Sequence, residues 1–145
     1  MSNILKETNI RLNEQIDSKE QAVREVGGIL FEEGYVQEEY IDTMMEREEI
    51  TSTYMGNYVA IPHGTEDAKK SVKETGIAII TAPDGVDFGN GNIVKLIIGI
   101  AGKGNEHLDI LSKIAIVCSE EENINRILEA STKSEVIDIF SEEVE

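Results

Sequence analysis

The stretch Ile93–Ile100, which reads IVKLIIGI, decides the fold of this chain. Its residues are apolar apart from one lysine and one glycine, and a second apolar stretch, GIAII, occupies Gly76–Ile80. A strand with one solvent-exposed face alternates between apolar and polar residues, whereas a strand buried on both faces is apolar almost throughout. The two stretches therefore predict strands of a sheet that helices cover on both faces.

Helical patterns lie on both sides of these strands in the sequence. Ser18 and Gln21 fit a capping box, in which each side chain bonds a free amide of the first helical turn. Apolar residues then recur at helical spacing up to Leu30, and Gly34 is expected to end the helix. A second helix is expected over residues 37–49. Further helix starts follow the second strand, at Asn105, at Ser119 with Glu122, and at Thr132 with Glu135.

Shorter elements complete the expected architecture. Strands are expected near residues 9–12 and 58–61, and Ala82–Gly85 has the composition of a turn that would lead into a short edge piece at residues 86–89. Strands that alternate with helices are typical of α/β proteins. We therefore expect one domain over residues 1–145, with a mixed, mostly parallel sheet of about five strands covered by helices on both faces.

The size and composition fit a globular protein of the cytoplasm. A chain of 145 residues is a common length for one domain. No apolar run approaches the roughly 20 residues of a membrane span, and the N-terminus lacks the pattern of a signal peptide. The single cysteine, Cys118, excludes an internal disulfide and is expected in the apolar core. We expect a cytoplasmic protein without direct membrane insertion.

The net charge of −16 excludes some classes of partner. Nucleic acids and anionic membranes are bound by basic residues that neutralise phosphates, so this chain is not expected to bind either. An acidic surface attracts a basic protein partner. Solubility explains the same charge equally well, so the charge alone excludes classes and selects none.

The segment Val59–Thr65, which reads VAIPHGT, holds one of the two histidines of the chain at the end of an expected strand. Pro62 has a fixed φ and Gly64 a free one, and such neighbours would hold the imidazole of His63 rigidly. A neutral imidazole can attack an electrophile, accept a proton or bind a metal. The alternative is a buried histidine whose two ring nitrogens are both hydrogen-bonded.

His107 and Arg47 are the other candidate site residues. His107 follows a strand and lies in the first turn of an expected helix, where free amides and the helix dipole favour anions. Loops after strands gather at one edge of an α/β sheet, so both histidines are candidates for that edge. Arg47 offers a guanidinium fork for a phosphoryl group. The alternatives are a surface role for His107 and a local ion pair for Arg47.

Together these segments resemble a known family. Arg47, Thr53–Gly56, Val59–Thr65, Gly99–Ala101 and Asn105–His107 are similar to the IIA components of the bacterial sugar phosphotransferase system, and most of all to the mannitol type of the fructose–mannitol group. The resemblance extends over nearly the whole chain. The combination of segments is specific, whereas Pro-His-Gly alone is a weak signal.

The resemblance implies a phosphocarrier. In that family, the histidine that matches His63 accepts a phosphoryl group on Nε2 from the phosphohistidine of the carrier protein HPr. It passes the group to a cysteine of the IIB component, and the membrane component IIC uses it during sugar import, here expected to be mannitol import. The residues that match His107 and Arg47 line the same site.

The residue types suit this chemistry. Phosphoryl transfer needs positioning and charge stabilisation more than covalent help, which a neutral imidazole and a nearby guanidinium supply. The sequence has no phosphate-binding loop for ATP and no clear metal cluster, so no cofactor and no metal are expected. Two successive protein partners would need an apolar rim, for which Tyr54 and Met55 are the candidates.

Two other functions remain open from the sequence. A regulatory protein of the IIA type would signal through its phosphorylation state, and the residues around His63 do not separate it from a transport component. A metal-dependent or acid–base hydrolase would use His63 and His107. A catalytic zinc ion needs a third protein ligand, and no carboxylate has a spacing from the histidines such as that of His-Glu-x-x-His.

Overall fold

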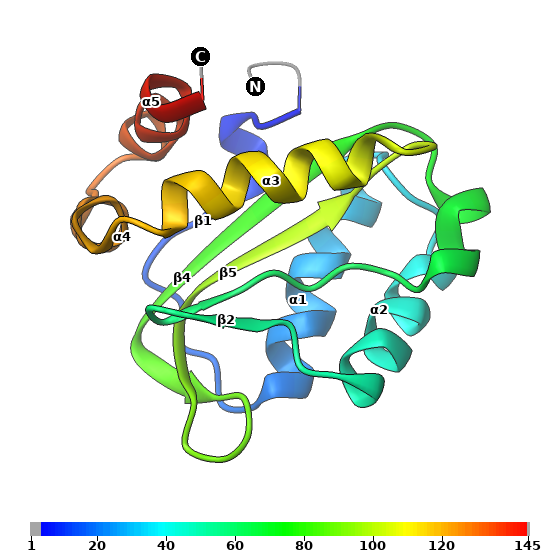
Figure 1. Cartoon of the computed structure of the whole chain (residues 1–145), viewed down its shortest axis with the longest axis horizontal. Coiled ribbons are helices and arrows are strands. Elements are labelled where there is room, and N and C mark those ends of the chain that lie inside the picture. The colour runs from blue at the N-terminus through cyan, green and yellow to red at the C-terminus, as the bar shows by residue number, and fades with distance from the viewer. Residues whose placement is uncertain (1–3, 145) are drawn as a thin grey trace.

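A five-stranded sheet lies between two layers of helices (Figure 1). The computed structural model describes the backbone of residues 4–144, and the side chains of this range except those of Glu66, His107, Glu143 and Val144. Within this range the strand order is β1-β4-β5-β3-β2. The strands are β1 (Ile10–Arg11), β2 (Tyr54–Gly56), β3 (Val59–Ala60), β4 (Gly76–Asp87) and β5 (Ile93–Ala101).

The sheet is mixed. Strand β1 pairs with β4 in parallel and β3 pairs with β5 in parallel, whereas β4 with β5 and β2 with β3 are antiparallel. The expected single α/β domain, with a mixed sheet of about five strands and helices on both faces, is confirmed. Parallel pairs make up two of these four pairings rather than most of them, because short connections join β2 to β3 and β4 to β5 directly.

Two strand predictions need correction. The segment Ala82–Gly85 does not end a strand, because β4 continues through it and its pairing with β5 shifts register between Thr81 and Val86. The positive φ of Gly85, 81°, serves this irregularity instead of a turn. At the N-terminus, part of the expected strand is a short 3-10 helix, η1 (Glu7–Asn9), and only β1 joins the sheet.

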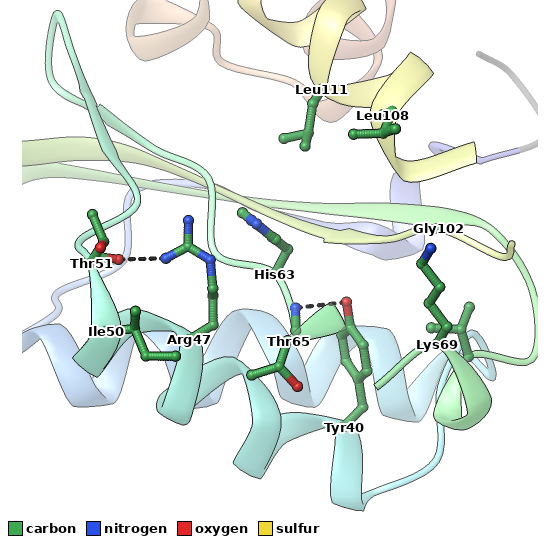
Figure 2. A pocket seen from close by; sticks show the side chains of 12 residues that line it. Tyr40, Arg47, Ile50, Thr51, His63, Thr65, Lys69, Gly102, Leu108 and Leu111 are labelled. Carbon is green, nitrogen blue, oxygen red and sulfur yellow. Dashed lines mark hydrogen bonds between the residues drawn. The ribbon is translucent and has the colours of Figure 1, made fainter. Parts of the chain in front are cut away.

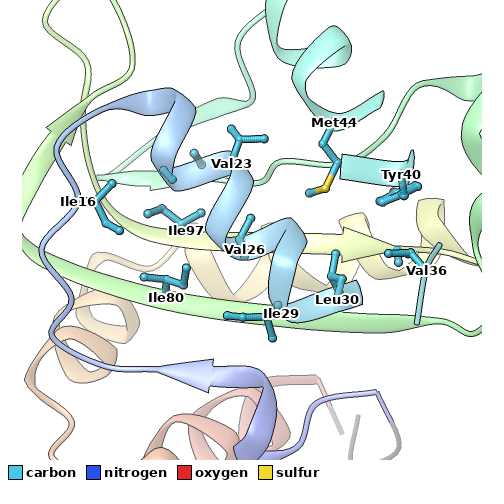
Figure 3. Packing of buried hydrophobic residues seen from close by; sticks show 14 of the residues in the cluster. Ile16, Val23, Val26, Ile29, Leu30, Val36, Tyr40, Met44, Ile80 and Ile97 are labelled. Carbon is cyan, nitrogen blue, oxygen red and sulfur yellow. The ribbon is translucent and has the colours of Figure 1, made fainter. Parts of the chain in front are cut away.

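Helices α1 (Lys19–Glu32) and α2 (Glu39–Ile50) cover one face of the sheet. The apolar stripe of α1 packs on the side chains that β4 and β5 direct toward it (Figure 3). Burial of these side chains from water supplies most of the stabilisation of this half of the domain. The buried cluster includes Val23, Val26 and Leu30 of α1, Met44 of α2, and Ala78, Ile80 and Ile97 of the sheet.

Helices α3 (Glu106–Cys118), α4 (Glu121–Glu129) and α5 (Lys133–Val144) cover the other face. The alternate residues of the same strands, among them Ile77, Ile79 and Ile98, form the second buried cluster with these helices. Cys118 belongs to this cluster, as predicted, and burial raises the pKa of its thiol to about 12. The apolar sequences of β4 and β5 thus reflect burial on both faces.

The predicted helix starts are confirmed in part. The Ser18 hydroxyl accepts from the Gln21 amide (3.1 Å), and the Thr132 hydroxyl accepts from the Glu135 amide (3.2 Å). Ser119 is not the cap of α4. It continues the last turn of α3, with φ −73° and ψ −18°, and its hydroxyl donates to the carbonyl of Ile116. Asn105 does start α3, but its side chain makes no capping bond.

Two glycines, one of them at the contact between α1 and the sheet and one away from it, test the packing. A Cβ added to Gly99 of β5 would lie 2.8 Å from Cγ2 of Val26, whereas one added to Gly28 of α1 would meet only Oε1 of Glu32, at 3.9 Å. We expect Gly99→Ala to lower the free energy of unfolding by about 1–3 kcal/mol, because the stiff valine has to move. Gly28→Ala should raise it by about 0.5–1 kcal/mol. Urea unfolding measures both, and equal effects of the two changes would contradict this packing.

Candidate functional site

A pocket of about 510 Å³ opens where β3 ends, between α2, the 3-10 helix η2 (Glu66–Ser71) and the start of α3 (Figure 2). It combines several polar side chains with an apolar rim. The polar group consists of Tyr40, Arg47, Thr51, His63, Thr65 and Lys69, and the apolar group of Ile50, Val72, Leu108 and Leu111. Two residues that the sequence selected, His63 and Arg47, therefore line one pocket.

The position of His63 is fixed by its backbone and by its ring. The chain just after β3 still pairs with β5, since the Ile100 amide donates to the Pro62 carbonyl (3.0 Å) and His63 forms a parallel bridge with Ile100. Nδ1 of His63 lies 2.8 Å from the Ile61 carbonyl. A carbonyl only accepts, so Nδ1 carries the proton, and in the neutral ring Nε2 carries the lone pair.

Gly64 is needed for space rather than for backbone freedom. Its φ is outside the left-handed region, so the free φ that the sequence analysis noted is not used here. An added Cβ would lie 2.6 Å from Cε1 of Tyr40 and 2.7 Å from the Thr43 hydroxyl. The loop after His63 therefore runs against α2. The Gly64 amide donates to the Tyr40 hydroxyl (2.9 Å), which in turn donates to the Ile100 carbonyl (2.8 Å).

Arg47 reaches the pocket from the last turn of α2. Its Nη1 donates to the Thr51 carbonyl (2.6 Å), which orients the guanidinium near His63 (Figure 2). The following loop is held by the buried carboxylate of Glu48, which accepts from the amide (2.9 Å) and the hydroxyl (2.5 Å) of Thr53. Arg47 thus bonds the backbone at the end of α2 and lines the pocket at the same time.

Three threonines near Arg47 and His63 in the sequence have different positions in the structure. The side chain of Thr53 is buried on Glu48 and does not line the pocket. Its carbonyl accepts from the Ile61 amide (3.1 Å), which ties the Arg47 loop to the strand that carries His63. Thr51 and Thr65 do line the pocket.

The side chain of His107 lies outside the described residues. Its backbone belongs to the first turn of α3, as the sequence predicted, and its neighbour Leu108 lines the pocket. The role of His107 therefore stays a prediction.

Sequence reasoning missed several residues of the pocket. Lys69, which the sequence analysis did not select, lines the pocket, and its Nζ donates to Oδ1 of Asn105 (3.3 Å). Tyr40 of α2 also lines the pocket and was not selected. Ile50, Val72, Leu108 and Leu111 are the apolar residues of the pocket, and Tyr54 and Met55, the candidates for an apolar rim, do not line it. The polar sequence around Lys69 carries no local signal that would have placed it there.

The pocket is suited to an anion that a nucleophile attacks. The side chains of Arg47 and Lys69 supply positive charge, and the imidazole of His63 lies in the same pocket with its Nδ1 on a backbone carbonyl. Among the described side chains, no group of three or more His, Cys, Asp or Glu residues is arranged to hold a metal ion. Within the described range, no helix is both long enough and apolar enough to cross a bilayer.

Comparison with known proteins gives the family. The sequence model of the family described as "Phosphoenolpyruvate-dependent sugar phosphotransferase system, EIIA 2" matches residues 3–143. This chain belongs to that family. An EIIA component is a phosphotransferase component, so the resemblance stated from the sequence and the expected class of activity are confirmed.

Similar EIIA proteins span nearly the whole chain. The mannitol-specific phosphotransferase enzyme IIA component of Geobacillus stearothermophilus is 62% identical over 139 residues, which cover 96% of each protein. The crystal structure of IIA mannitol from Escherichia coli has a TM-score of 0.88 and 37% identity, and the match covers 94% of this chain and 98% of that one. A complex of enzyme IIA and phosphorylated enzyme IIB for mannitol, also from Escherichia coli, has a TM-score of 0.88 and 34% identity over 95% and 97%.

Proposed function

We propose that this EIIA component is a mannitol-type phosphocarrier whose phosphoryl group resides on Nε2 of His63. The observation that carries the proposal is the hydrogen bond from Nδ1 to the Ile61 carbonyl, which makes Nε2 the nucleophilic nitrogen. Arg47 lines the same pocket and carries the charge that a phosphoryl group needs. The high identity to the mannitol-specific relatives supports mannitol as the imported sugar.

The reaction we propose has two steps of the same kind. In the first, Nε2 of His63 attacks the phosphorus of phospho-HPr in line, and the phosphorus–nitrogen bond to HPr breaks as the new one forms. In the second, a cysteine thiolate of IIB attacks the same phosphorus, and the imidazole leaves as the neutral ring. The loose transition state places negative charge on the three outer oxygens. Arg47 and Lys69 stabilise that charge, and His107 donates a further hydrogen bond.

The surroundings of the pocket fit protein partners. Ile50 and Leu108 are 73% and 61% exposed and lie on the same pocket, and exposed apolar side chains that are grouped at a polar site are typical of a protein-binding surface. The net charge of −16 would attract a basic partner and raise its rate of encounter. HPr and IIB would dock on this rim in turn, each through a small interface typical of transient complexes. Docking to IIB, which works with the membrane component IIC, would keep the protein in the cytoplasm.

A transfer assay tests this function. The purified protein is incubated with enzyme I, HPr and labelled phosphoenolpyruvate, and then with an isolated mannitol IIB domain. We expect an acid-labile, base-stable label on the protein that chases onto the IIB cysteine within the time of a normal turnover. Labelling without any chase to IIB would contradict the transport role. A strain that lacks mannitol IIA then separates transport from signalling, because a regulatory IIA protein would not restore growth on mannitol.

A further inference from the structure

The hydroxyl of Tyr40 is inserted into the backbone pairing beside His63. His63 is the residue that bridges to Ile100 in parallel. In a regular parallel ladder, the Ile100 amide would donate to the carbonyl of Pro62, and the amide of Gly64 would donate to the Ile100 carbonyl. The first of these bonds is present, from the Ile100 amide to Pro62. At the second, the Gly64 amide donates to Tyr40 Oη (2.9 Å), and Tyr40 Oη donates to the Ile100 carbonyl (2.8 Å).

The insertion is buried and tightly packed. Tyr40 is 4% exposed, and its ring lies so close to Gly64 that an added Cβ would be 2.6 Å from Cε1. Burial raises the pKa of the Tyr40 hydroxyl to about 12, an effect only partly offset by the hydrogen bond from Gly64. The hydroxyl therefore keeps its proton at physiological pH and remains the donor to Ile100. Figure 2 shows its bond to the loop directly below His63.

We propose that Tyr40 is a positioning residue for phosphoryl transfer, whose hydroxyl holds the loop after His63 one oxygen atom away from β5 and thereby sets where the imidazole stands. This inference rests on the proposed function of His63. Tyr40 acts through the backbone and not on the phosphoryl group. The residue lies on α2, seven positions before Arg47, so one helix positions both the nucleophile and the cation that faces it.

Loss of the hydroxyl would move the imidazole. In Tyr40→Phe the ring still fills its place, but the Gly64 amide and the Ile100 carbonyl lose their common partner. Buried polar groups of the backbone do not remain unpaired, so the loop would close onto β5 and form the direct ladder bond. A displacement of the nucleophile by about 1 Å is enough to slow a transfer reaction by about 10²-fold.

Tyr35→Phe is a matched control. Tyr35 is 2% exposed and its hydroxyl accepts a hydrogen bond from Asn9 (2.9 Å), yet it does not line the pocket. Each change removes one buried hydroxyl from one tyrosine. If Tyr40 had only a structural role, the two variants would lose similar stability and transfer phosphoryl groups at the same rate once corrected for the folded fraction.

The experiment combines kinetics with the state of the free ring. For Tyr40→Phe we expect kcat with phospho-HPr to fall about 10- to 100-fold, with KM little changed because the buried residue meets no partner. Nitrogen-15 spectra of the unphosphorylated protein should show shifted His63 ring nitrogens and a shifted Gly64 amide. Both should stay at their wild-type positions in Tyr35→Phe. Gly64→Ala, which pushes on the Tyr40 ring, should reproduce the loss of kcat.

Wild-type kcat in folded Tyr40→Phe, or an equal loss in Tyr35→Phe, would overturn the positioning role. Unchanged His63 ring nitrogens in Tyr40→Phe would overturn it as well. The ring measurement needs no phosphoryl donor, so it decides the role of Tyr40 even if the wild-type protein took up no phosphoryl group. In that event the proposed function is wrong, and the nitrogen-15 spectra still show whether Tyr40 positions the His63 ring.

Discussion

His63→Gln is expected to abolish phosphorylation of this protein completely. Glutamine has nearly the length of the imidazole and places its amide near the position of Nε2, so it fits the same space, although the hydrogen bond from Nδ1 to the Ile61 carbonyl is lost. It has no basic nitrogen to take the place of Nε2, and an amide does not accept a phosphoryl group under these conditions. The measurement is incorporation of labelled phosphate from phosphoenolpyruvate through enzyme I and HPr, with circular dichroism to establish that the variant is folded.

The second histidine supplies the control for this experiment. The chain has two histidines, so His107→Gln removes the same chemical group elsewhere. We expect His107→Gln to slow labelling without abolishing it, since its proposed role is charge stabilisation. Label that persists in His63→Gln and disappears in His107→Gln would mean that the two roles are exchanged. Label that persists in both variants would mean that neither histidine carries the phosphoryl group.

Arg47→Ala is expected to reduce the rate of phosphoryl transfer by about 10²–10³-fold, the usual effect of removing one preorganised donor from a site of developing negative charge. The donor is preorganised because Nη1 is already bound to the Thr51 carbonyl (2.6 Å), which leaves the other guanidinium nitrogens to meet the phosphoryl oxygens. Arg47→Lys should recover only part of the rate, since an ammonium group has no planar fork. Single-turnover transfer from phospho-HPr measures the chemical step directly.

Arg126→Ala is the control for charge. Arg126 lies on α4, pairs with Glu142 (2.9 Å) and does not line the pocket, so its removal changes the net charge by the same amount. We expect a wild-type transfer rate in this variant. A similar fall in both variants would show that the long-range field of the protein, rather than the guanidinium in the pocket, accounts for the effect of Arg47.

The parts of the fold that the sequence predicts well depend on short-range patterns. The apolar stretches Gly76–Ile80 and Ile93–Ile100 had to be buried on both faces, and helices do cover both faces. Capping at Ser18 and Thr132 followed from bonds that span only three residues. The segment Ala82–Gly85 was misread because a bulge in a long strand uses the same residue types as a turn.

The parts of the site that the sequence could not predict depend on contacts between distant residues. The Pro-His-Gly segment and Arg47 stand out locally, and they do line one pocket. The hydroxyl of Tyr40 meets a carbonyl 60 positions away, and Lys69 meets a side chain 36 positions away. An aromatic residue at helical spacing indicates packing in the core, and a lysine in an acidic segment indicates a position on the surface. Only the folded chain distinguishes those roles from roles in the site.

The pairing of Ile100 with the His63 loop determines how much of the site has to become ordered when a partner binds. Ile100 also pairs with Ile77 within the β4–β5 ladder at the centre of the sheet, and central strands of this kind belong to the last parts of a domain to open. The nucleophile is thus attached to the central pairing of the sheet, and we expect the strand to which its loop is paired to be ordered before a partner binds. Since neither encounter carries that entropic cost, each complex can dissociate quickly and still present the phosphorus at the same angle to the next partner.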